Sequence, residues 1–170
     1  MKYIEALETY EPKPGEVSLF LAGGITNCSD WQKKVVEALG SHHVVLLNPR
    51  RANFPMNDPE ASDAQIKNDP EASDAQIKWE HEHLKKATMI LFWFAPETLC
   101  PITLFEYGKW LVSPKPLFVG CDKDYSRKED VIIQTALERP FQKVHEGLYP
   151  LIVEAHDFLG EVNLFNVTRN

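Results

Sequence analysis

The distribution of hydrophobic residues predicts strands that alternate with helices along the chain. Short, nearly continuous apolar runs are typical of strands that are buried on both faces of a parallel sheet. They lie at residues 18–22, 43–47, 89–94 and 117–120, and a further short strand is expected around residues 142–145. The expected fold class is therefore α/β, with a mainly five-stranded parallel sheet and right-handed crossovers.

Apolar residues at helical spacing fill the segments between these strands. Helices are expected at residues 30–39, 104–112, 128–138 and 148–159, with another from about residue 75. Ligands of parallel sheets bind outside the carboxyl ends of the strands. A binding site is therefore expected at the loops that follow Ala22, Leu47, Phe94 and Gly120.

An exact tandem duplication interrupts the pattern. Residues 57–67 (NDPEASDAQIK) are repeated letter for letter as residues 68–78. Two copies cannot form a repeat fold, so the duplication is expected to lie in a loop, either as a tolerated surface insertion or as a lid. The second copy runs directly into Trp79 and is expected to hold the structural role.

Composition constrains the class of protein more than its activity. The 170 residues, 44% of them hydrophobic, are expected to form one domain over residues 1–170. The net charge of −7 argues against nucleic acid or an anionic membrane surface as the main partner. Three cysteines without a motif spacing, a polar N-terminus and no apolar run of membrane length predict a cytoplasmic protein.

Two glycines, Gly23 and Gly24, follow the first predicted strand. They would let a ligand approach the backbone, although they match neither a dinucleotide fingerprint nor a phosphate loop. Tight turns between a strand and a helix also use glycine for steric reasons. Both interpretations stay open.

Glu80 shares a helical face with Ile77 and Leu84. A carboxylate on a buried face is costly unless it has a partner, so Glu80 either makes a structural hydrogen bond or faces a ligand. His81 and His83 are two residues apart and point to different faces of the helix. They are assigned to a solvated polar surface, and no metal site is expected.

Thr103 and Glu106 match the capping-box pattern at the expected start of helix 104–112. Spacing alone favours this structural role. A helix N-terminus at the end of a central strand would also keep Glu106 ionised and nucleophilic. Gly108 inside the helix suggests a close approach by substrate or backbone, whereas Asp130 is explained as an acidic residue at the start of its helix.

Five segments in this order, FLAGGIT, NPRRANF, WEHEHL, TLFEYG and RKEDV, resemble the nucleoside 2-deoxyribosyltransferase-like family. The resemblance covers about residues 18–137 and implies a single doubly wound, flavodoxin-like (Rossmann-like) domain. It implies that the protein binds deoxynucleosides and free nucleobases and transfers 2-deoxyribose between bases through a covalent deoxyribosyl-glutamate, without a metal or other cofactor. It also implies a homo-oligomer in which neighbours complete each other's sites.

The resemblance gives the two glutamates their roles. Glu106 matches the nucleophile, and Glu80 matches a helix carboxylate that contacts the base or acts in proton transfer. An oxocarbenium-like centre at C1′ needs a carboxylate on one face and a proton donor for the leaving base, as in retaining glycosidases. Trp79, Phe54 and Trp93 are candidate stacking surfaces, although such residues more often belong to a core.

The resemblance also assigns five residues around the substrate. Gly23 and Gly24 match the loop that borders the sugar, and Asp130 matches a polar residue lent to the adjacent subunit's sugar. Phe20 stands where related proteins have a tyrosine that orients the nucleophile. Cys100 replaces an aspartate that reads the base, so base recognition is expected to differ here.

Two alternatives to the transferase stay open. The first is a hydrolase that cleaves 2′-deoxynucleoside 5′-monophosphates, in which Arg50 and Arg51 would bind the phosphate. The second is a non-catalytic nucleotide-binding module, in which Glu106→Gln would retain all function.

Overall fold

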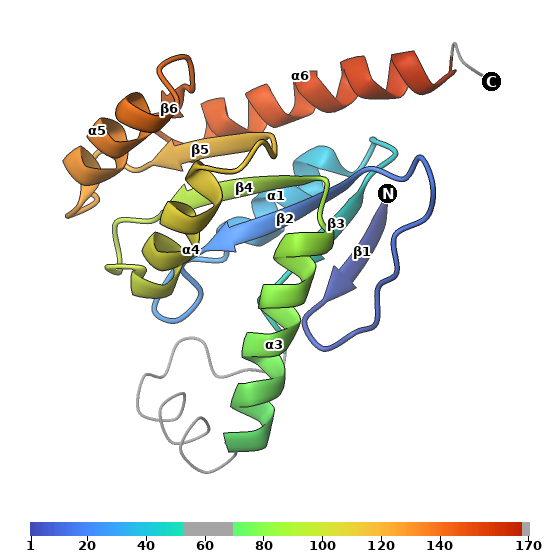
Figure 1. The fold of residues 1–170 in the computed structure, drawn as a ribbon, viewed down its shortest axis with the longest axis horizontal. Coiled ribbons are helices and arrows are strands. Elements are labelled where there is room, and N and C mark those ends of the chain that lie inside the picture. The colour runs from blue at the N-terminus through green and yellow to red at the C-terminus, as the bar shows by residue number, and fades with distance from the viewer. Residues whose placement is uncertain (53–69, 168–170) are drawn as a thin grey trace.

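Six parallel strands form one sheet in the computed structural model, which describes residues 1–52 and 70–167 (Figure 1). The strands are β1 (Lys2–Glu5), β2 (Ser18–Gly23), β3 (Val45–Asn48), β4 (Met89–Phe94), β5 (Leu117–Cys121) and β6 (Val144–His145). Their order is β1-β3-β2-β4-β5-β6, and every neighbouring pair is parallel. The order reverses between β2 and β4, and such a switch point is where doubly wound sheets bind ligands.

Helices cover both faces of the sheet, which confirms the doubly wound α/β fold. They are α1 (Trp31–Leu39), α3 (Pro70–Lys86), α4 (Pro101–Leu111), α5 (Lys128–Glu138) and α6 (Leu148–Val167). Core residues of α1 and α6 pack on one face of the sheet, and those of α3, α4 and α5 pack on the other. No helix in the described part of the chain combines the length and the apolar character needed to cross a membrane.

The strand β4 shows why the central run is apolar throughout. Met89, Leu91 and Trp93 pack into the core on the α1–α6 face. The alternate residues, Ile90 and Phe92 among them, pack into the core on the α3–α4–α5 face. Because side chains alternate between faces, a strand covered on both sides needs apolar residues at every position.

The sheet has six strands rather than the five expected, because β1 was not predicted. Of its four residues only Ile4 is buried, so it lacks the continuous apolar run of a central strand. It adds to the sheet edge by pairing with β3. The strand expected at residues 43–47 begins instead at Val45.

The helix α4 begins at Pro101, three residues before its expected start. Its N-cap is Cys100, which has a left-handed backbone (φ 48°) and makes no side-chain capping hydrogen bond. Proline is favoured at the first helical position because its φ is already helical and its missing N–H would have no partner there. The predicted capping box is therefore wrong, since Thr103 and Glu106 both lie inside the helix.

The second copy of the duplication, residues 68–78, continues into α3, as expected from its junction with Trp79. It contributes Gln76 and Ile77 to the side of α3 that faces the cavity described below. The first copy, residues 57–67, and the candidate stacking residue Phe54 lie outside the described residues.

Candidate active site

A cavity of about 600 Å³ opens at the carboxyl ends of β2 and β4, at the switch point of the sheet. Its walls come from β2 and its following loop, from the segment after β3, from α3 and from α4 along most of its length. The lining is mostly apolar with a few convergent polar groups, as is typical of small-molecule sites. Six of the predicted site residues line it: Phe20, Gly23, Gly24, Glu80, Cys100 and Glu106.

Glu106 projects from α4 into this cavity and is half-buried. Burial and the Glu80 carboxylate together raise its pKa to about 8, against the opposing effect of Lys109. It has no hydrogen-bonding partner among the described residues. The expectation that the helix start keeps Glu106 ionised is therefore wrong. The residue lies in the second turn of α4, beyond the reach of the N-terminal dipole.

Glu80 faces the same cavity from α3 and has one hydrogen-bond donor. Gln76 donates from Nε2 to Glu80 Oε1 (2.6 Å) and to the Pro49 carbonyl (2.9 Å). Burial raises the pKa of Glu80, whereas the Gln76 hydrogen bond and Arg51 lower it. The two carboxyl groups thus face one cavity, and the Glu80 carboxylate disfavours the ionisation of Glu106.

Cationic and neutral nitrogen groups line the cavity beside the carboxyl groups. Lys109 Nζ lies 3.4 Å from His81 Nδ1, and both residues line the cavity together with Arg51. The pKa of His81 is lowered by Lys109 and Lys85, which favours the neutral imidazole. In the described part of the chain, no group of three or more His, Cys, Asp or Glu residues is arranged to hold a metal ion.

The two glycines after β2 are required by close packing within the protein. A Cβ atom on Gly23 would lie 2.5 Å from a ring carbon of Trp31 and 2.6 Å from the Trp93 carbonyl oxygen. Gly24 is equally crowded by two cysteine sulfurs. The steric role is therefore established, and both residues also border the cavity. No described residue comes within 4 Å of the position that a Cβ atom on Gly108 would take, so the expected close approach by backbone is not found in this part of the chain, and an approach by substrate stays a prediction.

Comparison with known proteins agrees with this geometry. Residues 16–125 match the family model described as nucleoside 2-deoxyribosyltransferase like. The chain belongs to the nucleoside 2-deoxyribosyltransferase-like family. The matched segment includes both Glu80 and Glu106. No curated protein matches the chain.

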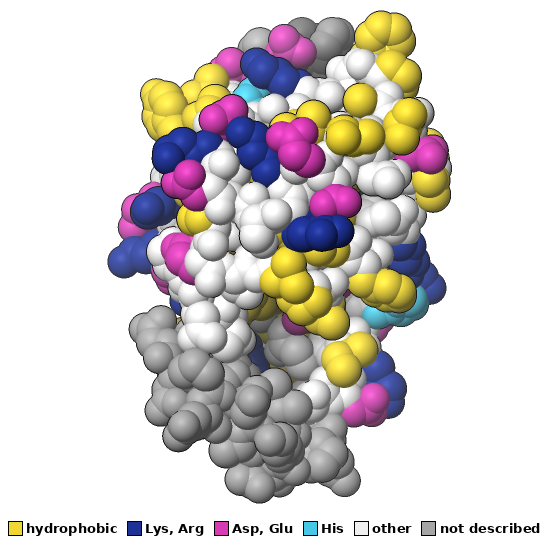
Figure 2. Space-filling view, turned by 90° about the vertical axis from the view of Figure 1, so that its left-hand side faces the viewer, with side chains coloured by type: hydrophobic (Ala, Val, Ile, Leu, Met, Phe, Trp, Pro, Cys, Tyr) yellow, Lys and Arg dark blue, Asp and Glu magenta, His cyan; other side chains and the backbone are white. Residues whose placement is uncertain are grey.

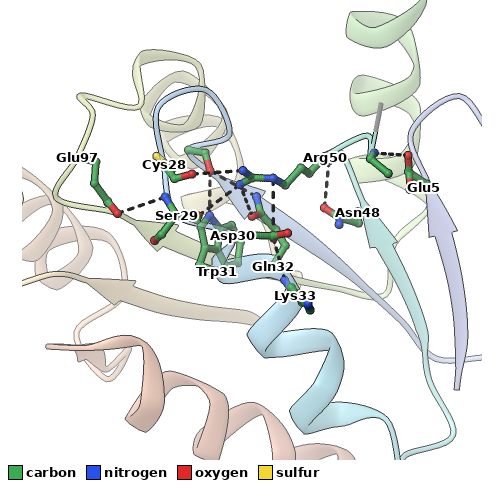
Figure 3. A network of polar contacts seen from close by, with 12 residues as sticks. Glu5, Cys28, Ser29, Asp30, Trp31, Gln32, Lys33, Asn48, Arg50 and Glu97 are labelled. Atoms are coloured by element: carbon green, nitrogen blue, oxygen red, sulfur yellow. Dashed lines mark hydrogen bonds and ion pairs between the residues drawn. The ribbon is translucent and has the colours of Figure 1, made fainter. Parts of the chain in front are cut away.

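In this nucleoside 2-deoxyribosyltransferase-like chain, Arg50 is a structural residue (Figure 3). From the end of β3 its guanidinium donates to the Cys28 carbonyl (3.2 Å), the Ser29 carbonyl (3.3 Å) and Gln32 Oε1 (3.3 Å). It also pairs with Asp30 at 3.8 Å and is only 9% exposed. Because these contacts occupy its donors, Arg50 holds the loop after β2 and does not line the cavity.

Trp79 lies in the hydrophobic core and is not among the residues that line the cavity. Its indole Nε1 donates to the Glu8 carbonyl (2.8 Å), and its ring packs near Phe20 and stacks on His83 with centroids 4.0 Å apart. His83 is 3% exposed, so its assignment to a solvated surface is wrong. Residues 79 and 83 are one helical turn apart and share the face of α3 that packs on the sheet.

Asp130 and Trp93 also lie outside the cavity lining. Asp130 stands in the first turn of α5, as expected, where its exposed carboxylate pairs with Arg127 (2.9 Å). Its role towards an adjacent subunit stays a prediction. Trp93 belongs to the core on the α1–α6 face.

Two cavity residues, Gln76 and Lys109, were not predicted. Gln76 holds Glu80, and Lys109 lowers the pKa of Glu106. Helical spacing could have indicated both residues, because Gln76 precedes Glu80 by four residues and Lys109 follows Glu106 by three. Once a carboxylate is placed on a helix, these positions are the first at which to look for its partners.

Proposed function

We propose that this family member is a nucleoside 2-deoxyribosyltransferase, which moves 2-deoxyribose between nucleobases with Glu106 as the nucleophile. The observation that carries the proposal is that Glu80 and Glu106 line one mostly apolar cavity at the switch point of the sheet. Retaining cleavage of a glycosidic bond uses such a pair, with one group acting as the carboxylate and the other as the acid.

The raised pKa values determine what substrate binding must accomplish. Burial raises the pKa of Glu106 to about 8, which favours its protonated form at neutral pH, and burial also raises the pKa of Glu80 against the opposing Gln76 hydrogen bond and Arg51. Attack on C1′ requires Glu106 to be ionised and Glu80 to be protonated. Substrate binding must therefore remove the proton of Glu106 while Glu80 stays protonated, and Lys109 favours the anion of Glu106.

With Glu106 ionised and Glu80 protonated, the transfer proceeds in two half-reactions. An oxygen of Glu106 forms a bond to C1′ while the C1′–N bond breaks, and the leaving base takes the proton of Glu80. In the second half-reaction the incoming base attacks C1′ of the deoxyribosyl-enzyme, and Glu106 leaves as the carboxylate. The N–H proton of the incoming base returns to Glu80, which restores the pair.

A slow 2-fluoro-2′-deoxynucleoside analogue tests the assignment of the two carboxyl groups. The expected result is a sugar adduct in the intact mass and its location on Glu106 in the peptide map. An adduct on Glu80 would reverse the two roles. Release of base without any adduct would exclude the covalent route. Glu106→Gln and Glu80→Gln serve as paired controls, since both remove a carboxylate from the same cavity.

A second candidate function is hydrolysis of 2′-deoxynucleoside 5′-monophosphates. It is favoured by the two cationic side chains, Arg51 and Lys109, that line the cavity and could pair with a phosphate. Incubation with a deoxynucleoside and a different free base separates the two functions. A new nucleoside supports transfer, whereas free sugar alone, formed faster from the 5′-monophosphate, supports hydrolysis.

We also propose that the protein is a homo-oligomer. Three apolar side chains of the α4 region are largely exposed: Ile102 (63%), Phe105 (76%) and Val112 (69%). Figure 2 views the side of the molecule where α4 and α5 lie and shows hydrophobic groups gathered between charged ones. A second copy packed there would cover them and bring Asp130 near a neighbouring site. Light scattering tests this, because Val112→Asp should produce monomers from a wild-type oligomer.

A further inference from the structure

Two thiols meet at the wall of the cavity, beside Gly24. A Cβ atom built on Gly24 would lie 2.5 Å from Cys28 Sγ and 2.9 Å from Cys100 Sγ. The two sulfur atoms are therefore separated by no more than the sum of these distances, and Cys100 Sγ donates a weak hydrogen bond to the Thr98 carbonyl (3.5 Å). Both cysteines are free and buried, with 3% and 4% of their surface exposed.

The two cysteines belong to segments that lie between the regular elements. Cys28 stands in the loop between β2 and α1, and Figure 3 shows it beside the Arg50 network. Cys100 is the N-cap of α4 and has a left-handed backbone, which a residue with a side chain adopts only under constraint. A disulfide needs the sulfurs about 2.05 Å apart. Side-chain rotation and a shift of these two loop positions would bring them together without moving the sheet.

The two thiols are not equivalent towards an oxidant. Cys100 lines the cavity and can be reached through it, whereas Cys28 lies behind it. The neighbouring Cys28 thiol lowers the pKa of Cys100, whereas the neighbouring Cys100 thiol, together with burial, raises the pKa of Cys28. The thiolate is the reactive form of cysteine. Cys100 is therefore placed as the attacking thiol and Cys28 as the resolving thiol.

We propose that Cys28 and Cys100 form a reversible intramolecular disulfide in response to hydroperoxides, and that this bond closes the cavity. The Cys100 thiolate attacks one peroxide oxygen, the O–O bond breaks, and the other oxygen leaves as water or an alcohol after taking a proton. Cys28 then attacks the resulting sulfenic acid, so that the S–S bond forms and water leaves. Two electrons pass from the thiols to the peroxide, and a dithiol reverses the reaction.

Closing the bond would deform two walls of the cavity at once. Gly24 lies against both sulfurs, since a Cβ atom there would contact each of them, so a movement that draws the sulfurs together also displaces the loop after β2. Cys100 is attached to the first turn of α4, and the same helix carries Glu106. A displacement of about 1 Å in a catalytic group is enough to lower a rate about 100-fold. This loss of catalysis rests on the proposed function, whereas formation of the disulfide does not.

Thiol counting and peptide mapping after addition of stoichiometric hydrogen peroxide test the bond itself. The expected result is that two of the three thiols disappear, that a Cys28–Cys100 peptide is found, and that Cys121 stays free. Cys121→Ser is the matched control and should form the same bond. Cys28→Ser should stop at a sulfenic acid on Cys100 that dimedone traps. Three free thiols, or a bond that includes Cys121, would overturn the proposal.

The effect of the disulfide on catalysis is measured separately, as the rate of base exchange. Peroxide should lower the rate of base exchange about 100-fold in the wild type, and dithiothreitol should restore the rate. Cys28→Ser cannot form the disulfide, so its cavity should not close. A mapped Cys28–Cys100 bond with an unchanged rate would show that the disulfide does not close the cavity. If the protein performs no base exchange, the proposed function fails, but the mapped peptide still decides whether the disulfide forms.

Discussion

Arg50 and Glu106 are ionisable side chains with little exposure near the loop that follows β2, but their surroundings differ. The Arg50 guanidinium has three hydrogen-bond acceptors and the Asp30 carboxylate around it. Glu106 has no hydrogen-bonding partner among the described residues, and its pKa is raised to about 8. A buried charge with satisfied hydrogen bonds can hold a fold together, whereas one without partners costs stability until a ligand supplies them.

The same difference extends to neutral groups around the cavity. Gln76 Oε1 and Trp110 Nε1 are buried and find no hydrogen-bonding partner among the described residues, and both residues line the cavity. Buried polar atoms are rarely left in this state, and each such atom calls for an explanation. Together with the two carboxyl groups they are the polar contacts that a bound substrate could complete. The Arg50 network is therefore structural, and the incomplete network is where chemistry is expected.

The largest expected effect comes from removing the carboxyl group of Glu106. Glu106→Gln should lower kcat/KM for base exchange by about 10⁴-fold or more, because loss of a covalent nucleophile removes the whole route. The folded state should not be weakened, since a neutral amide replaces a buried group that resists ionisation. Steady-state base exchange and thermal unfolding measure the two effects. Glu129→Gln, which changes an exposed acid of α5, is the control. Retained function in Glu106→Gln would favour a non-catalytic nucleotide-binding module.

Removing Arg50 should instead lower the stability of the folded state. Arg50→Met leaves two carbonyl oxygens and Asp30 without their partner. The expected loss is about 3 kcal/mol of unfolding free energy, or roughly 6–12 °C in Tm for a chain of this size. Arg127→Met is the matched control, because its exposed ion pair with Asp130 contributes less than about 1 kcal/mol. Equal losses of unfolding free energy in the two variants would show that the contacts of Arg50 stabilise the fold no more than an exposed ion pair does. The Arg50 network would then no longer differ from the cavity groups that lack partners.

Those parts of the sheet that follow a single rule, such as the continuous apolar run of a central strand, could be predicted from the sequence. The residues of β4 are apolar at every position because both faces are covered, and the expected strand matches the observed one. The position of its helix start placed Glu106 at the carboxyl end of a central strand, helical periodicity turned Glu80 towards a buried face, and both residues line the cavity. The edge strand β1 could not be found in this way, because only Ile4 is buried and its pairing with β3 depends on tertiary structure.

The local chemistry of the cavity was less accessible from the sequence. Thr103 and Glu106 have capping-box spacing, yet Pro101 starts the helix earlier, so a valid local pattern was applied at the wrong position. The raised pKa of Glu106 comes from burial and from Glu80 on another helix, and neither cause is visible in a local pattern. The contact between Cys28 and Cys100 likewise joins two distant segments.

The pH dependence of stability provides a third test of the comparison. The folded pKa of Glu106 is raised to about 8 from an ordinary value of 4.5, so the folded state holds a proton that the unfolded state has lost between these values. Its contribution to stability is present below pH 4.5 and is lost as the pH rises through 8. The loss should amount to about 1.4 kcal/mol for each unit by which the folded pKa exceeds the unfolded one, measured in denaturant titrations. Glu106→Gln should flatten this part of the curve; an unchanged slope would mean that Glu106 ionises normally.

The smallest effect is expected from Lys109, which lines the cavity next to Glu106 and lowers its pKa. Lys109→Met should raise the pKa of Glu106 further, so the acid limb of the kcat/KM profile, on which the nucleophile ionises, should move to higher pH. The Glu106 anion also loses a stabilising charge, and kcat should fall about two- to fivefold, because an exposed charge contributes less than about 1 kcal/mol. Lys123→Met, an exposed lysine outside the cavity lining, should leave both unchanged. An unmoved acid limb would leave the ionisation of Glu106 to burial and Glu80 alone.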